Sequence, residues 1–418
     1  DQLNTFLAQF HPHLGRREQR DQFALYARGR LGPLERKSLE PIALAEAASP
    51  RALQLFLDQR VWDEEGVLDL HQRLVAELLG TPEGIFITDA TSDAKKGSHT
   101  AGIARQYCGE SGKIDNCIVT VHWGYAGRDD LHVLLDGSLY LPPGWHDEGG
   151  GEQAASLRAK TGVPDGMEYR THTEMSIEQL RRIRENGVPG RWVAGDCEFG
   201  GNWQWREQVA QMDLLYVAEV PTTTQGYWRE PDFRLPRLKG GGLGRPASRL
   251  ASDIKKCEVA KVLERKKPAF ESWRVREGTK GPDVWQIARL PFWLATSKRP
   301  GQTQRGILLV ADNPLTGERK YFFSNAPAKT PTRELLRVAF SRWRIERCFQ
   351  DAKGELGLGH AETRSWKSLN RHLILTCVLH LFLTLLRSEW GGKSGSTDAQ
   401  PDSGRRRGDA LGQAPRSA

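Results

Sequence analysis

A carboxylate with a cation on either side occurs in the segment 342–353, near the C-terminal end of the chain. At about 100° per residue, Arg342, Glu346 and Lys353 fall within about 40° of one another on a helical wheel. An apolar stripe lies directly beside this charged ridge, and it consists of Val338, Ile345, Phe349, Ala352 and Leu356. We therefore predict a helix whose charged ridge borders the core. Such a ridge suits metal-assisted phosphoryl chemistry on a polyanion.

The other charged residues of this helix are predicted to face solvent: Arg344, Arg347, Asp351 and Glu355. The alternative for the ridge is an ordinary salt-bridged helix face, because opposite charges at i, i+4 spacing are common on helices. The rest of the chain favours the chemical interpretation.

Two aspartates each follow an apolar segment. Asp89 comes after Ile85-Phe-Ile-Thr, and Asp196 comes after Trp192-Val-Ala-Gly. Both segments are predicted as buried strands, and open α/β sheets bind ligands where their strands end. Alone, each aspartate could be a turn or cap residue. Asp93 is a second candidate for the first aspartate, but it is expected in the loop after the strand that Asp89 ends.

Together with Glu346, the two aspartates offer three oxygen ligands of the kind that Mg²⁺ or Mn²⁺ prefers. Two such ions can hold the attacking and the leaving oxygen of an in-line phosphoryl displacement. We expect one carboxylate to bridge both ions and the other two each to hold one.

Charge and composition are compatible with a DNA partner. The 418 residues include 60 Lys and Arg against 52 Asp and Glu, which gives a net charge of +8. A mildly basic cytosolic protein is the alternative. Six scattered cysteines without a CxxC pair argue against a zinc site and suit reduced thiols in a cytoplasm. The apolar run Leu373–Leu386 is short for a membrane span and is predicted as a buried core helix, so no membrane partner is expected.

Residues 1–80 are predicted to be helical, with a helix start at Ser49-Pro50 and a helix end at Gly80. This region is predicted to be a small DNA-binding region, and a solvated helical cap is the alternative. Its basic residues include Arg16, Arg17, Arg20, Arg28, Arg30, Arg36 and Lys37.

Residues 81–220 are predicted to form a mixed α/β sheet covered by helices. A turn is expected at Asp136-Gly137. The expected strands are 84–89, 116–125, 131–136 with 138–141, 191–196 and 214–220, and the expected helices are 176–186 and 203–211.

Residues 221–330 are predicted to be a β-rich insertion. Their glycine cluster Gly240–Pro246 lacks the pattern of a nucleotide-binding loop. Residues 331–390 return to the core as helices, and the tail 391–418 has the composition of a disordered segment.

Three blocks of residues resemble one family of enzymes. The first is Thr88-Asp-Ala-Thr-Ser-Asp-Ala-Lys-Lys-Gly97, followed by the similar stretches 98–109 and 112–117. The second is Val193-Ala-Gly-Asp-Cys-Glu-Phe-Gly200. The third resembles a Tyr-x2-Arg-x3-Glu-x6-Lys signature through Arg342, Glu346 and Lys353. Over roughly residues 15–390, the chain resembles a DDE transposase of a bacterial insertion sequence, in the family numbered seven hundred and one.

The resemblance implies an RNase H-like fold and a metal-binding triad of Asp89, Asp196 and Glu346, with two Mg²⁺ (or Mn²⁺) ions per active site. It implies cleavage at the ends of the element and transfer of the freed 3′-OH to target DNA. Arg342 and Lys353 would hold DNA phosphates, and Lys95 and Lys96 are candidates for further phosphate contacts, with a solvated loop as their alternative. The implied partners are the terminal inverted repeats, target DNA and a second copy of the chain on DNA, in the bacterial cytoplasm at the nucleoid.

Two positions depart from the family pattern. Ala339 stands at the signature tyrosine, which is thought to touch a DNA phosphate in related enzymes, with Phe340 beside it. Ala90 replaces the acidic residue that usually follows the first aspartate, so any role of that residue is lost or passes to Asp93. The alternatives to a transposase are an RNase H-like nuclease that does not move DNA and a non-catalytic DNA-binding derivative of a transposase.

Overall fold

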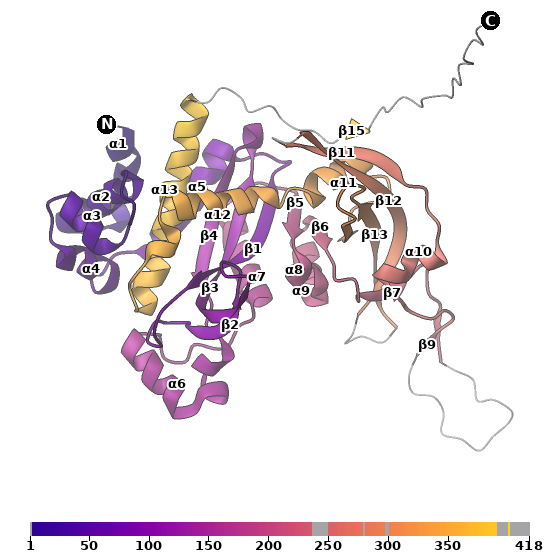
Figure 1. Ribbon diagram of the computed structural model, residues 1–418, viewed down its shortest axis with the longest axis horizontal. Helices are drawn as coiled ribbons and strands as arrows, with labels where there is room; N and C mark the ends of the chain where they lie inside the picture. Colours follow the sequence, from indigo (N-terminus) through magenta and orange to yellow (C-terminus); the bar gives the residue numbers. More distant parts are fainter. Residues whose placement is uncertain (1, 236–249, 279–280, 297–300, 391–399, 402–418) are drawn as a thin grey trace, which may run out of the picture.

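The computed structural model describes residues 2–235, 250–278, 281–296, 301–390 and 400–401. A single thirteen-stranded sheet runs through most of the molecule (Figure 1). The glycine cluster Gly240–Pro246 and nearly all of the tail 391–418 lie outside the described residues.

The centre of the sheet mixes parallel and antiparallel strands. β1 (Ile85–Ala94) is antiparallel to β3 (Lys113–Ala126). On its other side, β1 is parallel to β5 (Trp192–Gly195), which is parallel to β6 (Leu215–Glu219). The predicted mixed α/β sheet is therefore confirmed.

The outer strands of this half pair with β3. They are β2 (Ala104–Cys108) and β4 (His132–Leu139), both antiparallel to β3. The turn predicted at Asp136-Gly137 is wrong, because β4 continues through both residues. Asp136 is buried there and accepts hydrogen bonds from Gln72 (3.2 Å) and Gln179 (3.3 Å), so the strand can hold a carboxylate where the sequence pattern indicated a turn.

Most strands between 225 and 324 extend the same sheet beyond β6, through an antiparallel pairing of β6 with β14 (Arg319–Ser324). This part is rich in strands, as predicted for 221–330. Its other long strands are β11 (Glu271–Gly278), β12 (Gly281–Ala295) and β13 (Thr303–Asp312). Its short elements are β7 (Gln225–Tyr227), β8 (Phe233–Arg234), β9 (Ala251–Ser252), β10 (Cys257–Glu258) and α10 (Val262–Arg265), of which β8 and β9 form a separate pair. From the far end of the chain, β15 (Gln400–Pro401) pairs with β11.

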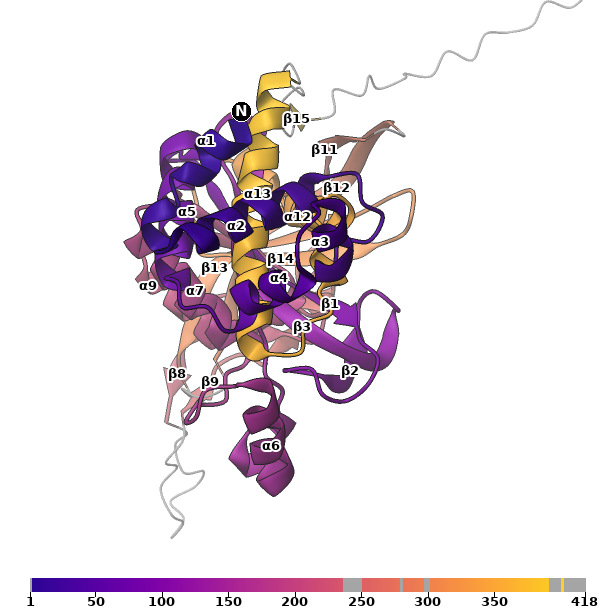
Figure 2. The same ribbon diagram turned by 90° about the vertical axis from the view of Figure 1, so that its left-hand side faces the viewer.

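The N-terminal part is helical, as predicted, and packs around the long helix α13 (Trp366–Trp390) (Figure 2). Ser49 is the N-cap of a helix and Gly80 the C-cap of another, as predicted. The helices are α1 (Gln2–Ala8), α2 (Arg17–Leu31), α3 (Leu39–Ala45), α4 (Pro50–Asp58) and α5 (Glu64–Leu79).

Two basic residues of this part hold the helices to the rest of the protein. Arg30 is 0% exposed and donates a 2.9 Å hydrogen bond to Oγ1 of Thr376 on α13. Buried Lys37 donates to the carbonyl of Arg30 at 2.8 Å and to that of Glu355, at the end of α12 (Trp343–Gly354), at 2.5 Å. The prediction that these two belong to a DNA-binding surface is therefore wrong, because tertiary packing has turned them inward.

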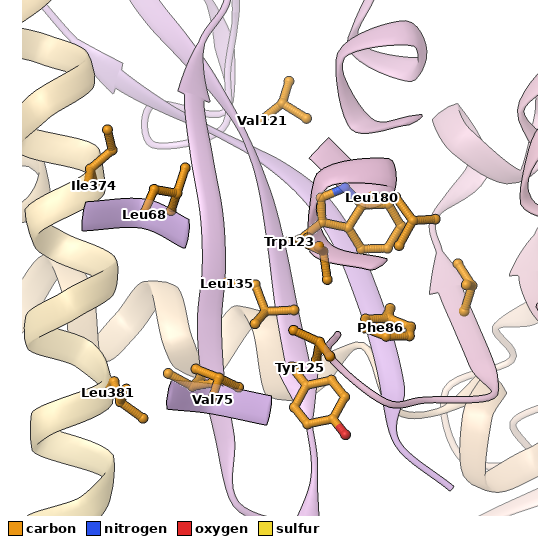
Figure 3. Close-up of a cluster of buried hydrophobic side chains, with 14 of the residues drawn as sticks. Leu68, Val75, Phe86, Val121, Trp123, Tyr125, Leu135, Leu180, Ile374 and Leu381 are labelled. Atoms are coloured by element: carbon orange, nitrogen blue, oxygen red, sulfur yellow. The ribbon is translucent and has the colours of Figure 1, made fainter. Parts of the chain in front are cut away.

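Helices cover both faces of the central sheet. α5, α7 (His172–Glu185) and α13 lie on one face and bury Phe86, Trp123 and Tyr125 (Figure 3). α11 (Thr332–Ala339) and α12 (Trp343–Gly354) lie on the other and bury Ile85 and Ile87. Because side chains alternate along a strand, residues two apart on β1 share a face. The remaining helices of this half are α6 (Asp147–Thr161), which was not predicted, α8 (Cys197–Gly201) and α9 (Trp203–Gln211).

The helix α13 is long and apolar enough to cross a membrane by length and composition alone. An 18-residue window within Trp366–Glu389 has a mean hydropathy of 1.6, yet 78% of that window is buried inside the protein. Phe6 of α1 packs against Phe382 with ring centroids 5.2 Å apart. The prediction of a buried core helix at Leu373–Leu386 is confirmed.

Candidate active site

Asp89 lies on β1, and Asp196 directly follows the neighbouring parallel strand β5. The pairing of β1 with β5 runs from Ile85–Trp192 to Ile87–Ala194. Two residues further, the same register sets Asp89 beside Asp196, across a strand spacing of about 4.8 Å. By alternation both side chains point to the face covered by α11 and α12.

The position of Asp89 within its strand differs from the prediction. Asp196 follows the last residue of β5, as expected, but β1 continues past Asp89 to Ala94. The continuation is possible because β3 pairs with β1 as far as Ala94–Cys117, beyond the point where β5 ends. Asp93 therefore lies on the strand and is buried. The prediction that Asp93 lies in a loop, which favoured Asp89 as the first aspartate, is wrong.

Backbone groups orient the Asp196 side chain. It is the N-cap of α8, and its Oδ1 accepts hydrogen bonds from the backbone N–H of Glu198 (2.9 Å) and Phe199 (3.4 Å). α8 lies so close to β6 that a Cβ on Gly200 would be 2.0 Å from the carbonyl oxygen of Glu219. A glycine is thus needed at 200 to keep this short helix, and with it Asp196, against the sheet.

Arg342 joins the late helix to this edge of the sheet. It is the N-cap residue of α12, and its Nη2 donates to Oδ2 of Asp89 at 2.9 Å. The same nitrogen lies 3.6 Å from Oε1 of Glu346, one turn along the helix. Its Nη1 lies 3.9 Å from Oε2 of Glu219 at the end of β6. One guanidinium therefore lies among three carboxylates from three different elements.

Burial and charge shift the pKa of the central pair. Burial, together with the nearby Asp196, raises the pKa of Asp89 to about 6, and the Arg342 charge opposes this shift. Burial lowers the pKa of Arg342, but Asp89, Asp196 and Glu346 outweigh that effect, so it is raised overall. Arg342 therefore stays charged, whereas Asp89 gains a negative charge only above weakly acidic pH.

The two cations of the predicted charged ridge pair with different carboxylates. Arg342 pairs with Glu346, as the spacing indicated, and the Glu346 side chain is 55% exposed. Lys353 instead lies 3.4 Å from Oδ1 of Asp93 and donates to the carbonyl of Ser92 at 3.0 Å. Both cations of the ridge therefore reach across to β1.

The apolar stripe beside the ridge is buried as predicted, but it spans two helices, because α11 ends at Ala339 and α12 begins at Trp343. The solvent-facing prediction is wrong for two residues. Arg344 is buried and pairs with Asp130, and Asp351 is buried and pairs with Arg347 (3.1 Å) and Arg387.

Lys95 and Lys96 have different environments. Nζ of Lys95 donates to the carbonyl oxygen of Ala361 at 2.8 Å and that of Gly359 at 3.4 Å, and burial lowers its pKa. Lys96 is exposed.

In the neighbouring strand-rich part, Trp273 and Trp285 are buried, while the charged groups of Arg229 and Lys266 lie over the ring of Trp228.

The ligand chemistry suits a hard divalent cation, since Asp89, Asp196 and Glu346 offer carboxylate oxygens. Across the described part of the chain, however, no three His, Cys, Asp or Glu side chains are already gathered closely enough to hold a metal ion. Arg342 lies between Asp89 and Glu346 and neutralises them in part.

Glu219 lies near the site but was not among the predicted site residues. The sequence pattern could have indicated it, because Glu219 comes near the end of the apolar segment 214–220, and Asp196 similarly follows the apolar segment 192–195. The proximity of Glu219 to Arg342 depends on the order of the strands in the sheet, and the pattern of one segment does not contain that order.

Two comparisons with known proteins agree with one another. The family model for DDE superfamily endonucleases matches residues 9–282. A probable transposase for insertion sequence element IS701 from Microchaete diplosiphon is 25% identical over 284 residues, which are 67% of this chain and 67% of that protein. The family match includes Asp89 and Asp196 and ends before α12.

Proposed function

Because the chain belongs to the DDE superfamily endonucleases, we propose that this transposase cuts DNA at the ends of an insertion sequence and joins the freed ends to target DNA. The reaction is cut-and-paste transposition with metal-dependent phosphoryl transfer. We assign the catalytic triad to Asp89, Asp196 and Glu346.

One relationship carries this proposal: continuing the register of β1 and β5 by two residues sets Asp89 beside Asp196, and Arg342 links Asp89 to Glu346. The strand order β4–β3–β1–β5–β6, with only the last three strands parallel, supports an RNase H-like core.

We assign two Mg²⁺ (or Mn²⁺) ions per site to the three carboxylates. When bound, such ions activate the attacking water and stabilise charge on the phosphate. The chain's own residues position the substrate and the ligands. The two backbone N–H groups on Oδ1 fix the orientation of the Asp196 carboxylate. Arg342 and Lys353 hold DNA phosphates by charge-assisted hydrogen bonds, and exposed Lys96 makes a further phosphate contact. Lys95 adjoins this surface, with its ammonium on the carbonyl oxygens of Gly359 and Ala361.

The remaining assignments concern partners and organisation. We assign DNA contacts to the helical region 1–80, the catalytic core to 81–220 with 331–390, and a β-rich insertion to 221–330. The partners are the terminal inverted repeats and target DNA, bound by a dimer in the bacterial cytoplasm, since two ends must be held together for joining.

Cleavage of a plasmid that carries the flanking ends of the element tests the proposal. With Mg²⁺, wild type is expected to cut at these ends, and Glu346→Gln, which removes the charge but keeps the shape, is expected not to cut. Glu355→Gln, at the exposed C-terminal end of the same helix, is the matched control and should cut like wild type. Cutting that ignores the ends would favour a general nuclease, and equal cutting by wild type and Glu346→Gln would refute the triad.

A further inference from the structure

Glu219 is the third acidic residue in a row that crosses β1, the C-terminal end of β5 and β6. β5 pairs with β6 from Trp192–Leu215 to Gly195–Ala218. The next step of this register sets Glu219 beside Asp196, and Asp196 is itself beside Asp89. Alternation along β6 points Glu219 to the face of Val217, which is the face covered by α11 and α12.

The two ends of the Arg342 guanidinium have different partners. Nη2 faces the two carboxylates assigned to the triad, Asp89 at 2.9 Å and Glu346 at 3.6 Å. Nη1 faces Glu219 at 3.9 Å. Arginine presents its donors in a rigid planar fork, so one guanidinium can serve both sides at once.

The backbone of Glu219 is held in place on two sides. It pairs with Phe322 of β14, and the backbone of α8 approaches its carbonyl oxygen closely at Gly200. The Glu219 side chain is 17% exposed, so its charge is partly shielded from water. Glu219 thus offers Arg342 a carboxylate on a fixed strand.

We propose that Glu219 is a positioning residue, which keeps Arg342 at the site when Asp89 and Glu346 bind divalent cations. This inference rests on the proposed function, in which those two carboxylates are metal ligands. A divalent metal ion on Asp89 would compete with the hydrogen bond from Nη2 of Arg342 to this carboxylate. Glu219 would then remain as the counter-ion of Arg342. Without Glu219, Arg342 depends entirely on Asp89 and Glu346 and competes more strongly with the metal.

A double-mutant cycle on Mn²⁺ binding tests the proposal, with the full chain free of DNA and titration calorimetry as the readout. Glu219→Gln is expected to weaken Mn²⁺ binding roughly three- to tenfold. In an Arg342→Ala background the same substitution should have only a small effect, because the residue through which Glu219 acts is gone. An equal loss in both backgrounds, or no loss in wild type, would overturn the proposal.

Glu198→Gln is the matched control for charge alone. Glu198 is two residues from Asp196 and pairs with His172 at 2.6 Å, and it is not among the ion-pair partners of Arg342 in the described residues. Its effect is expected to be small and equal in both backgrounds. A loss of Mn²⁺ affinity as large as that of Glu219→Gln would assign the effect to net charge and contradict the proposal.

Two further variants separate the possible failures. If Asp89→Asn leaves Mn²⁺ binding unchanged, the proposed metal site fails, and this inference fails with it. If Asp89→Asn abolishes binding while Glu219→Gln matches wild type, only the role of Glu219 fails. Glu219→Asp, which keeps the charge, should retain at least half of the wild-type affinity, and a loss equal to that of Glu219→Gln would indicate packing instead.

Discussion

Arg342 donates a 2.9 Å hydrogen bond to Asp89, 253 positions earlier in the chain. This contact connects the N-cap of α12 to the centre of β1, and it brings Glu346 towards the two aspartates. The half-buried Arg342 guanidinium is both a counter-ion of Asp89 and a hydrogen-bond donor that could turn to a phosphate. Under the proposed function, this pair would couple the arrangement of the assigned triad to the binding of DNA.

Replacing Arg342 by alanine is expected to separate metal binding from catalysis. Asp89 would lose the Arg342 guanidinium as its counter-ion, so Mn²⁺ should bind the DNA-free protein more tightly. DNA cleavage should nevertheless slow by roughly 10²-fold, because a phosphate donor at the site is lost. Calorimetry and single-turnover cleavage at saturating metal measure the two effects. If both affinity and rate stay at the wild-type level, Arg342 has no role in either step.

The choice between Asp89 and Asp93 can be decided by matched substitutions. Both side chains point to the same face of β1, but Asp89 adjoins Asp196, whereas Asp93 pairs with Lys353 at 3.4 Å. Asp89→Asn is expected to lower single-turnover cleavage by at least roughly 10³-fold, and Asp93→Asn by roughly tenfold or less. The reverse order of effects would make Asp93 the first catalytic aspartate.

Much of this site could be predicted from local sequence patterns. Asp196 follows its strand as predicted, and the apolar stripe from Val338 to Leu356 is buried. These features depend on periodicity within one element, which a single sequence contains.

The wrong predictions concern contacts between elements. Arg344 and Asp351 face away from the stripe on a helical wheel, yet they are buried because Asp130 and Arg387 come from other parts of the chain to meet them. Similarly, β1 extends past Asp89 because β3 continues to pair with it. A strand partner that lies far away in the chain leaves no mark on the local pattern.

Arg30 is expected to contribute to stability and not to DNA binding. Its guanidinium is fully buried and donates to Thr376 and to the carbonyl of Leu356, so Arg30→Met leaves buried acceptors unpaired. The free energy of unfolding should fall by about 2–4 kcal/mol in urea titrations. Arg17→Met, in the same helix with a 91% exposed side chain, is the control and should not change stability measurably. Equal stability of the two variants would contradict the buried arrangement.

Buried histidines should make the fold sensitive to acid. Burial lowers the pKa of His71 to about 4, and that of His122 and His380 to about 3, from an ordinary value of 6.5. Between pH 6.5 and the lowered pKa of each histidine, the unfolded chain binds a proton that the folded chain does not. The stability that the three neutral histidines contribute is therefore complete above pH 6.5 and is lost as the pH falls towards 4, by at most about 1.4 kcal/mol per histidine for each pH unit.

Urea titrations between pH 7.5 and pH 4.5 measure this loss. His122→Gln removes one of the titrating groups and should make the dependence on pH less steep. His99→Gln, at an exposed position, should leave the slope unchanged. A His122→Gln slope identical to that of wild type would show that His122 does not titrate differently in the two states.

Lys95 and Lys96 are neighbours that should behave differently towards DNA. Lys96 is exposed, so Lys96→Ala is expected to lower the dependence of DNA affinity on salt by about one unit of slope, with unchanged stability. The ammonium of Lys95 instead donates to the carbonyl of Ala361, and Lys95→Ala should lower the urea midpoint while the salt slope stays nearer to that of wild type. Binding titrations on an end fragment from 50 to 200 mM salt give the slopes. If Lys95→Ala lowers the slope as much as Lys96→Ala does, the Lys95 side chain leaves its carbonyl partners to reach DNA.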